Sequence, residues 1–406
     1  MKPFLLAVLL FAGLAPIAAA LPLPAAMGPC PQGKRPSTTQ STKTAKHSKG
    51  QLQSGTAKAA AAKTAAQAGV YIGDKLHPFD NLPPSMGRLT QAAAQRARSW
   101  CEMTGSVAIV DDRDRFVLVA PAGLSGMDRF MSVAVKTANW LDEELPSTAN
   151  QMPPLPEGQY QDDLFMPDGS AAIIYVLDTE ADQARLVEFL VKEEPSLAGW
   201  RKDAAGLAGF HLLRPLCAGV VLQVAGNEEW SPEHEVVSRT AKVLAQRRFG
   251  VLPYWFAEGL GWAAEWKYDR QLYCFSHRDE FIFTVEHGAW GKNVTRKYEK
   301  RAKSPIEPKE VEALKRGVWN IDAAEYSFGL TSWLLQQDPH KLSMALEAMR
   351  VIRDRENRQP LDNGGWTRIP GWDLPADSWD KEFARQYGAD WRFTATKDLA
   401  KGLRNL

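Results

Sequence analysis

The clearest pattern of apolar and polar positions in this chain lies between Ser231 and Trp266. Ser231 suits a helix N-cap, Pro232 suits the first helical position, and Gly250 suits a left-handed C-cap. On both sides of this glycine, apolar residues recur at the spacing of a buried helical stripe. The two stripes comprise Val236, Val237, Thr240, Val243 and Leu244, and then Trp255, Phe256, Gly259, Leu260 and Ala263. The pattern predicts two helices joined by a tight turn.

Shorter apolar runs upstream of this pair predict a small mixed sheet with interspersed helices. A charged turn between the first two runs predicts a β-hairpin. The expected strands are Ser106–Val110, Phe116–Ala120, Ala171–Leu177, Gly209–Leu213 and Ala218–Val224, and the expected helices are Met127–Leu145 and Thr179–Lys192. Downstream, helical spacing returns at Ala323–Gln336, Pro339–Arg355 and Ser378–Tyr387. The expected fold class is therefore α+β, with a mixed sheet, a helix pair and a helical C-terminal half.

Five segments follow from this pattern and from composition. Residues 1–20 are apolar after Lys2 and end in Ala-Ala-Ala, which predicts a secretory signal peptide. Residues 21–69 predict a flexible basic linker, because the stretch from Pro31 to Gly69 contains no acidic residue and almost no large apolar side chain. A Pro-rich and helical lead-in is expected at 70–100, the mixed-sheet subdomain with the helix pair at 101–266, and a mostly helical subdomain at 267–406.

Composition narrows the class of partner. The net charge of +1 over 406 residues argues against nucleic acid as the main partner. After signal cleavage no other run is long and apolar enough for stable membrane insertion, so an exported periplasmic or secreted protein is expected. The basic linker could contact an anionic polymer of the cell envelope. Export permits disulfides among Cys30, Cys101, Cys217 and Cys274, but bridges and buried free thiols remain equally open.

The predicted helix pair carries residues suited to a zinc hydrolase. A helical zinc site of the H-E-x-x-H type uses two histidines at i and i+4, with the glutamate as general base. Here His234 and Glu235 begin the motif, and Glu258 follows on the second helix. Ser238 occupies the position of the second histidine, and a neutral hydroxyl is a poor zinc ligand. The metal-binding signal is therefore incomplete.

The segment Leu252–Leu260, with the sequence LPYWFAEGL, resembles the segment that carries the third zinc ligand in bacterial peptidase-MA-like domains. These domains belong to the gluzincin clan of zinc metallopeptidases. The resemblance extends diffusely over Ser106–Arg392 and implies a gluzincin-like fold. It implies Zn²⁺ as cofactor, His234 and Glu258 as ligands and Glu235 as catalytic base. It also implies that the strand before the helix pair, at Val220–Val224, forms an edge for an extended peptide.

Four further residues have two interpretations each. Tyr326 could supply a phenol to a developing oxyanion, as the resemblance implies, or could pack in the core. Glu265 could orient His234 or could be a solvated charge. His277 and His287 could replace the missing zinc ligand from a loop, although isolated histidines are seldom ligands.

Three functional hypotheses follow. The favoured one is a catalytically impaired metallopeptidase homologue that binds a peptide or an envelope protein. The second is an active zinc peptidase, in which Ser238 holds a water that completes the ligand set. The third is a structural protein of the envelope.

Overall fold

The computed structural model describes residues 68–146, 171–226, 230–273, 287–301, 307, 310, 321–356, 358–360, 366–368 and 376–402. All of them belong to one compact unit, Ala61–Leu406. The predicted signal peptide, nearly all of the basic linker, Cys30, Cys274 and His277 lie outside the described residues.

A seven-stranded mixed sheet forms the first half of the unit, in the order β2-β1-β3-β4-β5-β7-β6. Its strands are β1 (Val70–Ile72), β2 (Lys75–His77), β3 (Ser106–Val110), β4 (Phe116–Pro121), β5 (Ala172–Thr179), β6 (Phe210–Leu212) and β7 (Cys217–Gln223). Strands β4, β5 and β7 run parallel, whereas β3 and β6 pair antiparallel with β4 and β7. The α+β class predicted from the sequence is confirmed.

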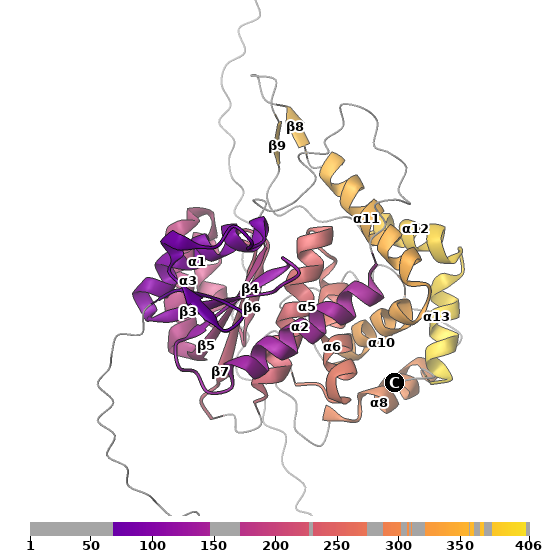
Figure 1. The fold of residues 1–406 in the computed structure, drawn as a ribbon. Coiled ribbons are helices and arrows are strands. Elements are labelled where there is room, and N and C mark those ends of the chain that lie inside the picture. The colour runs from indigo at the N-terminus through magenta and orange to yellow at the C-terminus, as the bar shows by residue number, and fades with distance from the viewer. Residues whose placement is uncertain are drawn as a thin grey trace, which may run out of the picture. The chain divides into compact units, whose positions relative to one another are not determined.

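Helices cover both faces of this sheet (Figure 1). Alternate residues of one strand point to opposite faces, so Val117 and Val119 of β4 pack with α1 (Arg88–Thr104) and α3 (Glu180–Glu193). Their neighbours in the strand, such as Leu118, pack with α2 (Met127–Glu144) and α5 (Pro232–Phe249). Burial on both faces explains why β4 and β5 are continuous apolar runs.

The strand before the helix pair differs from the expectation for an edge. Strand β7 lies between β5 and β6, so its first half is paired on both sides. Beyond the short β6, the indole of Trp230 donates a hydrogen bond to the carbonyl of Val221 at 2.8 Å. The edge strand on this side of the sheet is therefore β6.

The remaining described helices pack behind α5. They are α6 (Tyr254–Asp269), α8 (Trp290–Lys300), α10 (Ile321–Gln336), α11 (Pro339–Glu356), α12 (Ala376–Tyr387) and α13 (Trp391–Ala400). Short elements complete the described chain: η1 (Phe79–Asn81), η3 (Pro195–Gly199), α4 (Arg201–Ala204) and the ribbon of β8 (Arg358–Pro360) with β9 (Trp366–Arg368). Among the described residues, no helix combines the length and the apolar character needed to cross a membrane.

Two buried cysteines settle one open question. Cys101 on α1 and Cys217 on β7 are both free thiols, so neither forms the bridge considered from the sequence. Burial raises the pKa of each thiol to about 12. Both side chains therefore act as small apolar core residues.

Candidate functional site

The predicted helix pair forms as expected, in Pro232–Phe249 and Tyr254–Asp269. Pro232 is the first residue of α5, and Ser231 precedes it without a side-chain capping bond. Gly250 ends the helix with φ 73° and ψ −148°, a conformation that essentially only glycine adopts but that is not the predicted left-handed helical cap. Pro253 is then the N-cap residue of α6, which begins at Tyr254.

Three successive turns of α5 face three turns of α6 in antiparallel order. His234 lies opposite Glu265, near the end of α6. Ser238 lies opposite Gly261, where an added side-chain carbon would come within 2.6 Å of the serine Oγ. Lys242 lies opposite Glu258, near the start of α6. These contacts fix the register of the two helices.

His234 is buried between two carboxylates. Its Nδ1 lies 3.1 Å from Glu265 Oε2 and its Nε2 lies 3.0 Å from Asp269 Oδ2. Burial lowers the pKa of His234, but the hydrogen bonds and charges of these two carboxylates outweigh it and leave the pKa above its ordinary value. Glu265 is fully buried and orients His234, so the alternative of a solvated charge is wrong.

A second buried ion pair joins the start of α6 to α5. Lys242 Nζ lies 2.5 Å from Glu258 Oε2, and both side chains are at most 2 % exposed. Burial alone would raise the pKa of Glu258, but the charges of Lys242, His211 and Arg239 lower it to about 2. Glu258 is therefore an ionised carboxylate that already holds a cation.

A third pair occupies the base position of the predicted motif. Arg239 Nε donates to Glu235 Oε2 at 3.0 Å, one turn along the same helix, and both residues are buried. Gly209, just before β6, packs against this pair, because an added side-chain carbon would lie 2.8 Å from Glu235 Oε2. The second carboxylate oxygen of Glu235 is buried and has no hydrogen-bond partner.

The predicted ligands are thus distributed over different contacts. His234 and Glu258 take separate partners about two turns apart along α5, and the buried hydroxyl of Ser238 between them has no hydrogen-bond partner. In the part of the chain that the structure describes, no three His, Cys, Asp or Glu side chains form a group that could hold a metal ion.

The H-E-x-x-S sequence, His234–Ser238, lies one helical turn before the residues of α5 that face Glu258. The two residues of α5 that are four positions apart and meet α6 at Gly261 and Glu258 are Ser238 and Lys242. The residue directly after Ser238, where such a motif has its glutamate, is Arg239. In this register the five positions read S-R-T-A-K. Sequence reasoning missed Lys242, although a lysine between Ala241 and Val243 in a helix expected to be buried requires a partner.

Tyr326 on α10 faces α8 rather than the charged pairs. Its hydroxyl accepts a hydrogen bond from Arg301 Nε at 2.9 Å, and Lys297 Nζ lies 5.1 Å from the centre of its ring. These contacts give Tyr326 a packing and hydrogen-bonding role between two helices.

His287 is fully buried close to His234. Its ring lies 4.0 Å from that of Tyr273, which in turn lies 4.5 Å from the ring of His234. The three rings form a cluster of edge-to-face and tilted contacts at the end of α6.

Comparison with known proteins adds no assignment: no protein-family model and no curated protein matches the chain.

Proposed function

We propose that this chain is an exported, non-hydrolytic relative of the gluzincin-type zinc peptidases, which binds a peptide or an envelope protein without cleaving it. One observation carries the proposal. A lysine ammonium lies 2.5 Å from the buried carboxylate that the sequence indicates as the third zinc ligand.

A zinc peptidase of this type needs two histidines and a glutamate around one metal, with a second glutamate that activates water. In the register set by the helix contacts, Ser238 and Lys242 take the histidine positions and Arg239 takes the position of the base. Lys242 supplies the positive charge that Glu258 would otherwise receive from zinc. Arg239 carries the opposite charge to a general base and is held by Glu235.

The active-peptidase hypothesis has less support. Zinc binding by His234 and Glu258 would require both residues to leave their partners, which are the buried Glu265 and Lys242 and the exposed Asp269. Breaking a buried ion pair costs about 3–5 kcal/mol. The resemblance at LPYWFAEGL is retained as an indication of ancestry and of a peptide-binding cleft.

A joint metal and peptide assay tests the proposal. The full chain is dialysed against excess zinc and then against buffer, and bound zinc is measured by plasma mass spectrometry. The same protein is immobilised and exposed to a tryptic digest of casein. Peptides retained without new cleavage products, at substoichiometric zinc, would support the proposal. Stoichiometric zinc that is lost in His234→Ala, together with new cleavage products, would establish the active enzyme instead. If the protein neither retains nor cleaves peptides, the remaining hypothesis is a structural protein of the envelope.

A further inference from the structure

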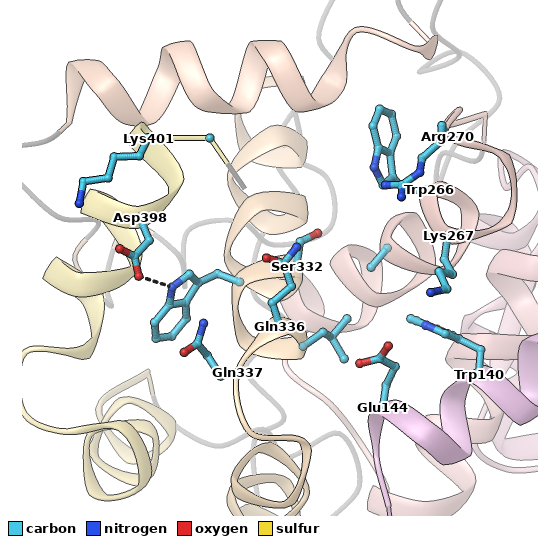
Figure 2. A pocket seen from close by; sticks show the side chains of 14 residues that line it. Trp140, Glu144, Trp266, Lys267, Arg270, Ser332, Gln336, Gln337, Asp398 and Lys401 are labelled. Atoms are coloured by element: carbon cyan, nitrogen blue, oxygen red, sulfur yellow. Dashed lines mark hydrogen bonds between the residues drawn. The ribbon is translucent and has the colours of Figure 1, made fainter. Parts of the chain in front are cut away.

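A pocket with a cavity volume of about 930 Å³ lies between α2, α6, α10 and α13, away from the charged pairs of α5. Such a volume is at the upper end of the range for small-molecule sites, roughly 300–1,000 Å³. Figure 2 shows side chains of all four helices directed toward it.

All four helices meet the pocket with their C-terminal ends. The lining residues of α2, α6 and α10 are in the last two turns of each helix or just beyond, and those of α13 are in its final turn or just beyond. A helix C-terminus carries a partial charge of about −0.5 and leaves carbonyl oxygens without partners inside the helix. Four such ends around one pocket favour the binding of a positively charged group.

The basic residues of the lining fit this field. Lys267, Arg270 and Lys401 each lie in the last turn of a helix or directly after it, where cations are stabilised by the helix dipole. Glu144 and Asp398 add two carboxylates. These side chains alone carry one excess positive charge. Four helix C-termini at about −0.5 each outweigh it and leave a negative balance on the order of one elementary charge.

Indole rings provide the apolar walls. Trp333 Nε1 donates to Asp398 Oδ2 at 3.2 Å, so this ring is oriented by a carboxylate. Trp140 lines the same pocket from α2. The third ring, Trp266, already has the Arg270 guanidinium 5.9 Å from its centre. Tryptophan is the aromatic residue that attracts cations most strongly. The pocket is therefore built for cation–π contact.

Two buried polar groups of the lining have no hydrogen-bond partner. They are Ser332 Oγ and Trp266 Nε1, in side chains that are 4 % and 7 % exposed. A ligand with an oxygen close to its cationic group would provide a partner for them after a small rotation of the side chains.

Glu144 is a carboxyl group of the lining that burial affects. Burial raises its pKa, and Lys267 and Trp140 lower it without restoring the ordinary value. A cation bound beside Glu144 would favour its ionised form.

We infer that this pocket binds an organic cation, namely a trimethylammonium group or the guanidinium group of a basic peptide. The pocket is separate from the charged pairs of α5 and α6, and its proposed ligand does not depend on the proposed function.

Three probes of nearly equal shape test the inference by isothermal titration calorimetry on the full chain. Choline carries the cation, 3,3-dimethylbutan-1-ol is its neutral counterpart, and 3,3-dimethylbutanoate is an anion. We expect choline to bind at least about fivefold more tightly than the alcohol, and the anion to bind most weakly. Equal binding of choline and the alcohol, or tightest binding of the anion, would overturn the inference.

Two substitutions localise the effect. Glu144→Gln removes a carboxylate and should weaken choline binding about five- to tenfold, whereas Lys267→Gln removes a competing cation from an exposed position and should strengthen it. The opposite pattern would identify an anion site. Thermal melts confirm folding, and Lys267→Gln alone decides the sign if Glu144→Gln is unstable. The peptide acetyl-Gly-Arg-Gly-amide is then added as a competitor. Displacement of choline would indicate a basic peptide as the source of the cation, and no displacement would indicate a small molecule.

Discussion

Replacing Lys242 with methionine removes the ammonium group and keeps most of the side-chain volume, so Glu258 loses the cation that hydrogen bonds to it. Removing one partner of a buried ion pair costs about 3–5 kcal/mol. The pKa of Glu258 changes in the direction that this pair requires, because the charge of Lys242, with those of His211 and Arg239, lowers it to about 2 despite burial. We expect Lys242→Met to lower the free energy of unfolding by about 3–5 kcal/mol at pH 7.

The pH dependence follows from the direction of the pKa change. Because the pKa of Glu258 is lower in the folded state, the pair stabilises the fold fully above a pH of about 4.5, and this stabilisation is lost as the pH falls through about 2. In Lys242→Met, Glu258 can instead take up a proton, so the difference from the wild type should be smaller at pH 4 than at pH 7. Urea unfolding followed by tryptophan fluorescence measures both values.

A double variant provides the control. Lys242→Met combined with Glu258→Met replaces the pair by apolar side chains of similar volume, which is often neutral for stability. We therefore expect the double variant to recover most of the loss. A loss below about 1 kcal/mol for Lys242→Met at pH 7, or a double variant less stable than the single one, would refute the buried ion pair.

Three further predictions concern other parts of the helix pair and the core. Gly259→Ala should destabilise the protein by about 1–3 kcal/mol in urea unfolding, because the added carbon would lie 2.6 Å from a backbone oxygen of α10. The control Gly199→Ala has open space around the added carbon and should change stability little. Equal effects of the two substitutions would contradict the close contact between α6 and α10. The pKa of His234 is raised in the folded state, so this residue stabilises the fold fully below about pH 6.5, and the stabilisation is lost as the pH rises through the folded-state pKa. The difference in unfolding free energy between the wild type and His234→Asn should therefore shrink from pH 6 to pH 9. A growing difference would contradict the contact of His234 with two carboxylates. With the other two cysteines replaced by serine, Cys101 and Cys217 should react with a thiol reagent at pH 8 only after unfolding, and fast reaction of the folded protein would show that they are not buried.

Local signals in the sequence were sufficient for most elements. The charged turn between two apolar runs correctly predicted the hairpin of β3 and β4, and Pro232 and Gly250 correctly bounded α5. Strands β1 and β2 were missed because three residues are too few to show alternation. Helix α8 was missed because its aromatic and basic residues suggested irregular structure.

The register of the two site helices could not be obtained in this way. Helix α5 is buried almost all around from His234 to Ala245, so apolar spacing does not show which face meets α6. The residues His234 and Glu235 and their spacing to Glu258 then suggested a site one turn away from the α5 residues that face Glu258. The better signals were Lys242, a charge between the apolar residues Ala241 and Val243, and Gly261, a small residue that permits close approach.

Ser238, Lys242 and Glu258 are proposed to occupy the three positions of a former metal site. Zinc binding by the Ser238→His/Lys242→His double variant examines these positions alone, because Arg239 and its partner Glu235 remain unchanged. We expect about one tightly bound zinc per chain in the double variant and substoichiometric zinc in the wild type, measured by plasma mass spectrometry after dialysis. A further Glu258→Gln substitution should abolish the binding. Stoichiometric zinc in the wild type, or a folded double variant that binds none, would show that these residues do not form such a site.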